Sequence, residues 1–458
     1  MSQRPSRFPD ALVLIFALIV VALVATWLLP TGEFERVAAG SRTKVVPGTF
    51  HEVQAAALPW HAFLTSIPRG FERAGEVIFF VFIVGGVIGV LRAGGAIDAL
   101  LTSSIRALGH RPVLLIAGMT VVLSVGAATI GMAEEYVPFV PILVSMCAAL
   151  GFDALVAVGI VYVAAGIGYA AAAHNPFTVV IAQTIAELPP HSGAGWRWLL
   201  WCIAITVGVV HLARYALRVR RDPSRSLLAG VDAGPLEQAQ HVPMSVRHVV
   251  ALASFAVGIG VFVWGSASRD WALTELSAIF LGCALLSAFL APLGPNRTAR
   301  EFCKGAAEMT STALLIGFAK TIQVVLEDGH CIDAVVHAIA TPLEGLGPDV
   351  SAVGMLAVQS ATNLFIPSGS AQAYVTMPLM TPLADLTGVS RQAAVLAFQC
   401  GDGLTNMVIP TNAVLMGVLA LGRVPYQRWL RFIGPLVVQL FLLFALALIV
   451  ARHLGIDA

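Results

Sequence analysis

Five ionisable side chains lie within long apolar stretches of this sequence: Glu134, Glu135, His174, Lys320 and Asp402. A charged side chain at the centre of a lipid-facing helix costs about 2.5–3.5 kcal/mol on insertion scales. We therefore expect these groups to face protein or a water-filled cavity. There a carboxylate can hold a proton or a cation, and an ammonium group can bind an anion.

Each of these groups has a functional and a structural interpretation. Glu134 and Glu135 are predicted to coordinate a coupling ion, carry a proton or pair with a cationic substrate, or else to cap the helix that follows them. Asp402 lies between two glycines and is predicted to share the first role, or to be a hydrogen-bonded structural carboxylate. His174 either contacts substrate or is a core histidine, and Lys320 either binds a carboxylate or locks the packing of its helix.

Neutral hydrogen-bonding side chains accompany these charges in segments rich in Gly, Asn and Pro. Small hydroxyl and amide groups at unwound helices are suitable ligands for a carboxylate or a dehydrated sodium ion. The predicted substrate-binding set is Glu134, Glu135, His174, Asn175, Ser368, Gly369, Ser370, Gln372, Asp402, Thr405, Asn406, Thr411 and Asn412, with Thr178 and Asn363 as further candidates. The predicted coupling-ion set is Glu135, Asn175, Asp402 and Asn406, with sodium or a proton as the ion. No catalytic residue, organic cofactor or other metal is predicted.

The composition places these residues in a membrane protein. Of 458 residues, 58% are hydrophobic and 12% are charged, and the mean hydropathy is +0.85. Soluble domains are about 25% charged, and this chain has apolar material for at least about ten bilayer crossings. A soluble enzyme with one anchor and a disordered chain are thereby excluded. The net charge of +1 excludes a nucleic-acid binder, because it offers phosphate no collective attraction.

The distribution of Lys and Arg predicts which side each connection faces. The apolar run 11–29 is too long for a signal-peptide core and is predicted to be a retained first span with the N-terminus inside. Seventeen Lys and Arg then fall in inside segments and nine in outside segments, as the positive-inside rule requires. The segment 327–349 has five acids and no Lys or Arg, so we expect it outside. The prediction is about 11 transmembrane helices, a cytoplasmic N-terminus and a periplasmic C-terminus.

Two halves of the sequence resemble each other. Residues 90–100 (VLRAGGAIDAL) and 325–335 (VLEDGHCIDAV) match at six of eleven positions, at an offset of 235. Farther along, the offset becomes 237 and aligns Asn175 with Asn412. The connections that follow the two matched stretches differ in charge, one carrying mainly arginines and the other only acids, so they are predicted to face opposite sides. A repeat with opposite orientation is typical of a secondary transporter with inverted halves.

Helix breakers divide the two halves in the same way. The 42 glycines and 25 prolines are more than continuous transmembrane helices would be expected to contain. The first repeat is predicted over 1–213, with a re-entrant hairpin near 112–150 and a broken helix near 154–187. A cytoplasmic linker follows over 214–247. An extra crossing and the second repeat are predicted over 248–458, with a hairpin near 350–388 and a broken helix near 391–422. Backbone groups freed at membrane depth must line a cavity or be buried in protein. We expect the two tips (126–135 and 363–370) and the two breaks (173–176 and 401–412) to meet near the midplane as a substrate site. The alternative is that the breakers only kink continuous helices.

Four stretches carry a resemblance to a known family: AEEYVPFVPIL (133–143), NPFTVVIAQ (175–183), IPSGSAQA (366–373) and AFQCGDGLTNMVIPT (397–411). They resemble the signature stretches of the YfcC-like branch of the anaerobic four-carbon-dicarboxylate carrier family, within the ion-transporter superfamily. The resemblance runs from residue 10 to 450. It implies a bacterial inner-membrane carrier with two inverted repeats, each with a hairpin and a broken helix, and a homodimer that moves substrate by an elevator motion. Members of the family are associated with dicarboxylates, with arginine/ornithine exchange, and with short peptides or fatty acids.

The sequence departs from the sodium-coupled dicarboxylate carriers of that superfamily at the hairpin tips. Ser-Asn-Thr motifs bind the substrate in those carriers, whereas here SGS at 368–370 and TN at 405–406 stand without the full triplet. The acidic pair at 134–135 favours a cationic or zwitterionic substrate, or proton coupling.

The function predicted from the sequence is secondary active transport. The expected cargo is a small carboxylate-bearing metabolite or an amino acid, moved by ion or proton coupling or by exchange. A basic amino-acid antiporter of the arginine/ornithine type is the alternative. Minor alternatives are a channel and an intramembrane hydrolase that would use Ser368 or Ser370 with His174 as its base. The expected partners are the small-molecule substrate, the lipid bilayer and a second copy of the chain, with no nucleic acid.

Overall fold

A computed structural model of the chain describes residues 11–455 except 40–41, 47, 109–110, 134–135, 138, 176, 232–241, 270, 272 and 344. The described part is almost entirely helical, with nineteen α-helices. The first nine are α1 (Ala11–Leu28), α2 (Ala62–Arg73), α3 (Gly75–Ala93), α4 (Ala96–Leu108), α5 (Pro112–Ile130), α6 (Phe139–Ala149), α7 (Ala154–Ala170), α8 (Val179–Ile185) and α9 (Ala194–Arg221). After α10 (Val246–Arg269) come α11 (Leu273–Leu290), α12 (Pro295–Glu308), α13 (Thr310–Asp328), α14 (Ile332–Ala340), α15 (Pro348–Asn363), α16 (Gly369–Thr387), α17 (Arg391–Thr405), α18 (Ala413–Leu421) and α19 (Tyr426–His453).

Several helices before α10 have counterparts of equal or similar length at the same place after it. Helices α3 and α13 each have 19 residues, and α9 and α19 each have 28. The short helices α8 and α18, of 7 and 9 residues, occupy the same place in each series, directly after a longer helix that stops early. Helix α10 stands between the two series, at the position where the sequence predicts an extra crossing.

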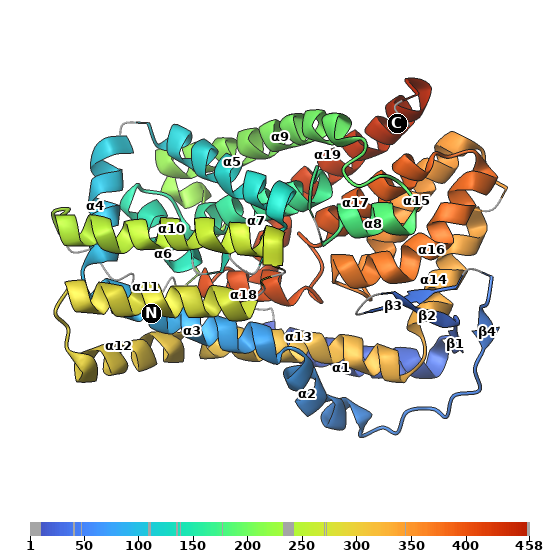
Figure 1. Ribbon diagram of the computed structural model, residues 1–458, viewed down its shortest axis with the longest axis horizontal. Coiled ribbons are helices and arrows are strands. Elements are labelled where there is room, and N and C mark those ends of the chain that lie inside the picture. The colour runs from blue at the N-terminus through green and yellow to red at the C-terminus, as the bar shows by residue number, and fades with distance from the viewer. Residues whose placement is uncertain are drawn as a thin grey trace.

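The two hairpins lie at opposite ends of the molecule. In Figure 1 the helices α4 and α12 mark one end of the long axis, and α14 and the β-strands mark the other. Helices α5 and α6 lie toward the first end, whereas α15 and α16 lie toward the second, and both pairs turn near the middle (Figure 1). Each pair therefore approaches the middle of the molecule from its own end.

Many helices are apolar on their outer surface, as a bilayer requires. Phe289 and Leu442 are 82% and 62% exposed on helices of high apolar content. Within the described residues, five helices are long and apolar enough to cross a membrane alone, or six if the bent pair α12 and α13 forms one span. The sequence predicts about 11 crossings. The difference arises in part because that prediction, which counts the two re-entrant hairpins separately, includes helices with shorter apolar stretches, such as α1, α7 and α10.

A small β-structure corrects the expectation of an all-α chain. Strands β1 (Gly32–Glu33) and β4 (His51–Glu52) pair antiparallel, and so do β2 (Arg36–Ala39) and β3 (Arg42–Val45). Outside the apolar runs this polar segment satisfies its backbone by strand pairing. Asp333, at the start of α14, fixes the segment in place: it accepts hydrogen bonds from Arg36 Nη2 at 2.7 and 2.8 Å and from Phe34 N at 3.1 Å.

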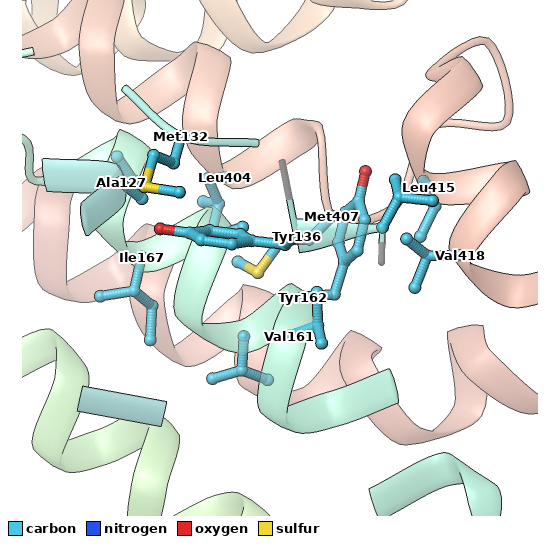
Figure 2. Packing of buried hydrophobic residues seen from close by; sticks show 14 of the residues in the cluster. Ala127, Met132, Tyr136, Val161, Tyr162, Ile167, Leu404, Met407, Leu415 and Val418 are labelled. Carbon is cyan, nitrogen blue, oxygen red and sulfur yellow. The ribbon is translucent and has the colours of Figure 1, made fainter. Parts of the chain in front are cut away.

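The core joins residues from both halves of the chain. Tyr136 and Met132 from the first hairpin, and Tyr162 from α7, pack in one cluster with Leu404 and Met407 from the end of α17 (Figure 2). Met407 is fully buried. The first hairpin and the two broken helices therefore form one packed unit rather than separate halves.

Candidate functional site

A cavity of about 450 Å³ lies where the two hairpin tips and two helix breaks meet. Its lining includes residues from each of these four places. They are Gly131, Met132 and Ala133 of the first tip, Phe177 and Thr178 of the first break, Ser368, Gly369 and Ser370 of the second tip, and Asn406, Thr411 and Asn412 of the second break. Six of the thirteen predicted substrate-binding residues thus share one cavity.

The first tip and first break hold each other in place. Helix α5 ends at Gly131, whose φ of 77° is the left-handed conformation that ends helices and that glycine adopts without strain. The carbonyl of Ala128 then accepts hydrogen bonds from Ala173 N and His174 N, at 3.2 and 3.1 Å. Asn175 is fully buried and accepts from Phe177 N at 2.8 Å, so it shapes the break from behind the cavity wall.

The second tip and second break are tied in a similar way. Helix α15 ends at Asn363, whose Nδ2 donates to Asp402 O at 2.9 Å and to Thr405 Oγ1 at 3.1 Å. Thr411 Oγ1 donates to Leu364 O at 3.0 Å. These side-chain bonds to backbone carbonyls join the end of α15 to the end of α17 and to the segment that precedes α18.

Asp402 lies in the last turn of α17, one turn earlier than the unwound segment. The sequence predicts a break over 401–412, but the helix continues to Thr405 because Gly401 and Gly403 serve close helix packing instead. Asp402 is 1% exposed, and its Oδ1 accepts from Asn406 Nδ2 at 2.9 Å. Its Oδ2 lies 2.7 Å from where a Cβ at Gly369 would be, so it faces the second tip.

Thr178, from the other half of the chain, contacts the same glycine through its methyl group. The Thr178 Cγ2 lies 2.6 Å from the position that a Cβ at Gly369 would occupy, and Asp402 Oδ2 approaches the same position. The Thr178 Oγ1 is buried, and no partner for it exists among the described residues. A buried hydroxyl without a partner costs free energy, so this place has unused capacity for an ion or a polar ligand. Carboxylate and hydroxyl oxygens are ligands for hard cations such as sodium.

A chain of hydrogen bonds extends from Asp402 along the second break. Asn406 Oδ1 accepts from Asn412 Nδ2 at 2.7 Å, and Asn412 Oδ1 accepts from Tyr162 OH at 3.0 Å and from Leu415 N at 2.9 Å. Asn412 is thus the N-cap at which α18 begins. This network fixes the amide groups that face the cavity.

The opposite wall of the cavity comes mainly from α2, α3 and α13, and it combines polar side chains with apolar ones such as Val77 and Ile316. Lys320 Nζ donates to Gln323 Oε1 at 2.7 Å, and Gln323 Nε2 donates to Glu327 Oε1 at 2.7 Å. Glu327 in turn forms an ion pair with Arg73. Arg73, Glu76, Lys320 and Gln323 all line the cavity. Apart from Lys320 these residues were not predicted, although the spacing of 320, 323 and 327 along one helix face was a usable signal.

The remaining predicted residues lie behind the wall or apart from it. Gln372 is fully buried and donates to Gln359 Oε1 at 2.7 Å, which ties the two arms of the second hairpin. Thr405 Oγ1 donates to Gly401 O in its own helix. Glu134 and Glu135 lie outside the described residues; Ala133, which precedes them in the sequence, lines the cavity.

His174 does not line the cavity, in disagreement with the predicted substrate contact. Its ring nitrogens lie 3.2 Å from His191 Nδ1 and 3.3 Å from Trp198 Nε1, because the break turns the side chain toward the connection between α8 and α9. Ser368 and Ser370 line the cavity without this histidine.

Helices α7 and α17 cross closely at the site. Gln399 Nε2 donates to Ala172 O at 2.5 Å and to Tyr169 O at 3.2 Å, so α17 caps the end of α7. A Cβ at Gly403 would lie 2.2 Å from Ala170 N, closer than any real Cβ contact. Backbone meets backbone at this crossing, and only glycine fits.

Replacing Gly403 with alanine should therefore destabilise the protein. Overpacking of this kind costs about 1–3 kcal/mol, and we expect a lower Tm of the purified protein in detergent. Gly260 is the matched control, because its added Cβ meets nothing within 4 Å. Gly260→Ala should keep or raise Tm, since alanine favours helix by about 0.5–1 kcal/mol. Equal Tm values for the two variants would refute the close crossing.

The chain belongs to the C4-dicarboxylate anaerobic carrier family, whose model matches residues 8–453. It is therefore a membrane protein of a transporter family. It is similar to YfcC of Escherichia coli (strain K12), whose name describes it as a candidate basic amino acid antiporter; the two are 32% identical over 99% of this chain and 98% of YfcC. It is also 28% identical to an uncharacterised protein of Haemophilus influenzae, over 98% of this chain and 97% of that protein.

Two solved transporter structures are also similar to the chain. The YdaH transporter of Alcanivorax borkumensis has 16% sequence identity and a TM-score of 0.44, over 98% of this chain and 99% of YdaH. MtrF of Neisseria gonorrhoeae has 16% identity and a TM-score of 0.44, over 97% of this chain and 95% of MtrF.

Proposed function

We propose that this transporter carries small carboxylate-bearing metabolites or amino acids by secondary active transport, with ion or proton coupling or by exchange. One observation carries the proposal: residues of both hairpin tips and both helix breaks line a single cavity of about 450 Å³. Such a volume accommodates a small metabolite. Binding at broken helices near the middle of the molecule is typical of secondary transporters.

The arrangement of the helices supports alternating access by two inverted repeats. Several helices of α1–α9 match helices of α11–α19 in place and length, such as α9 and α19, and the hairpins approach the cavity from opposite ends (Figure 1). The cavity lies between these hairpins and the wall formed by α2, α3 and α13. Movement of the packed unit of hairpins and broken helices along that wall would expose the cavity to each side in turn, as an elevator mechanism requires.

The charges of the cavity favour a substrate with a carboxylate. Lys320 on α13 and the N-terminus of α16 at Ser368 both face this cavity. An ammonium group and a helix N-terminus both attract anions. With its carboxylate bound between Lys320 and Ser368, the rest of the substrate would lie toward Asn406 and Asn412.

A basic amino-acid antiporter is the second candidate. Glu76 lines the cavity and Asp402 lies behind its wall, so acidic groups accompany Lys320. A carboxylate at one end and an amine at the other would match this mixture. The name of the E. coli relative points to the same class of substrate.

We place the coupling site at Asp402, with Asn406 as its positioning partner and Thr178 opposite. Sodium would use the Asp402 carboxylate together with the unpartnered hydroxyl of Thr178, and a proton would use the Asp402 carboxylate alone. Asn175, also predicted in this role, holds the backbone of the first break.

The proposed setting is the bacterial inner membrane, with a cytoplasmic N-terminus, a periplasmic C-terminus and a homodimer. The arginines of α9 at 214–221 and of α12 at 297–300 support the orientation, because they gather at the end marked by α4 and α12 (Figure 1). Crosslinking of single-cysteine variants in membranes would test both the sidedness and the dimer.

A ligand screen tests the function. Dicarboxylates, basic amino acids and short-chain acids are added to purified protein, each with and without sodium, and Tm is measured. A ligand at 100 times its Kd stabilises by about 2.7 kcal/mol, so the cargo should raise Tm by several degrees. The same compound should then show saturable uptake into proteoliposomes, accelerated by substrate on the opposite side. Unsaturable flux at channel-like rates would refute the carrier.

A further inference from the structure

A second cavity, of about 660 Å³, lies between α9 and α19, away from the substrate site. Four arginines line it: Arg214, Arg218, Arg225 and Arg431. The first two stand one helical turn apart on α9, the third follows in the short turn after that helix, and the last comes from the first two turns of α19. In Figure 1 the C-terminal part of α9, which carries Arg214 and Arg218, runs toward the end of the molecule marked by α4 and α12.

The positive charge of this cavity is largely uncompensated. Arg225 pairs with Asp222 at 3.0 Å, but Arg214, Arg218 and Arg431 have no ion pair within the described residues. Like charges spaced four residues apart on a helix repel each other. A bound anion would remove that repulsion, and guanidinium groups match a phosphate with two parallel hydrogen bonds.

The other wall of the cavity is apolar and continues into the lipid-facing surface. Val207, Val210 and Pro435 line it. Beyond the cavity, Val438 and Leu442 on α19 are 60% and 62% exposed. A ligand that fills this space therefore needs a phosphate at the arginine end and hydrocarbon along α9 and α19.

We propose that this cavity binds an anionic phospholipid, with its phosphate on Arg214, Arg218 and Arg431 and its acyl chains along α9 and α19. A basic pocket between transmembrane helices at the cytoplasmic side suits anionic headgroups. A free phosphate ion shares the headgroup chemistry but makes no use of the apolar wall. The proposal does not depend on which substrate the transporter carries.

The test measures Tm of the full-length protein in detergent with added lipid. Phosphatidylglycerol and cardiolipin should raise Tm, whereas phosphatidylethanolamine, inorganic phosphate and glycerol phosphate at equal concentration should not. The variant R214Q/R218Q/R431Q should lose most of that rise. The matched control is R297Q/R300Q/K304Q, which removes three exposed cations from α12 at the same end and should keep it.

Native mass spectrometry provides a second measurement that does not need the triple variant to be stable. The wild-type protein should retain anionic lipid, and Arg218→Gln alone should retain less. An equal response to phosphatidylethanolamine, an equal Tm shift with free phosphate, or undiminished lipid retention in the cavity variants would each overturn the proposal.

Discussion

Replacing Asp402 with asparagine should lower the rate of uptake by at least about tenfold, which corresponds to about 1.4 kcal/mol in activation free energy. It should also remove the dependence of uptake on sodium or on pH. Asparagine keeps the size of the side chain and can still accept the hydrogen bond from Asn406. What it loses is the negative charge that would hold the coupling ion. Uptake into proteoliposomes is measured at several sodium concentrations and pH values, with Tm of each protein recorded.

Asp385→Asn is the matched control for this experiment. Asp385 is a half-exposed carboxylate at the end of α16 that pairs with Arg391 at 2.8 Å, away from the cavity. Its loss should leave uptake and ion dependence unchanged. If Asp402→Asn also left uptake, sodium dependence and pH dependence unchanged, Asp402 would have no coupling role.

The sequence predicted where the chain leaves its helices better than it predicted the ends of those helices. Glycine, asparagine and proline within apolar segments predict helix ends, because glycine and asparagine adopt left-handed backbone conformations and proline lacks the backbone N–H donor. The tips and breaks accordingly lie within a few residues of their expected positions. The second break begins at Asn406 rather than at Gly401, because the two glycines around Asp402 fit against neighbouring backbone. A glycine that permits close packing and one that permits a turn look the same in sequence.

The wall opposite the tips was largely beyond prediction from the sequence. Arg73 pairs with Glu327, and Arg36 pairs with Asp333, across more than 250 residues of chain. No local pattern specifies such partners; the tertiary packing of α2 against α13 brings the first pair together. His174 shows the converse, since a polar residue next to a break was expected in the cavity but turns away from it.

Lys320 is the residue whose replacement tests the substrate side of the proposal. Lys320→Gln should raise the Kd or KM for carboxylate substrates by about 10- to 100-fold, since hydrogen bonds to charged groups contribute about 1.5–3 kcal/mol. Glutamine is nearly as long and can still bond to Gln323, so α13 should keep its packing. Lys304→Gln on the exposed face of α12 is the control and should change neither constant.

A pair of ligands separates loss of the carboxylate contact from general damage to the cavity. An amino acid that binds the wild-type protein is compared with the amine that lacks its carboxylate. The amine has no carboxylate and cannot contact Lys320 in either protein. Its Kd should therefore be higher than that of the amino acid for the wild-type protein, and Lys320→Gln should not change it. The amino acid should fall toward the level of the amine in the variant. Equal losses for both ligands would show that Lys320 supports the shape of the cavity and not the carboxylate.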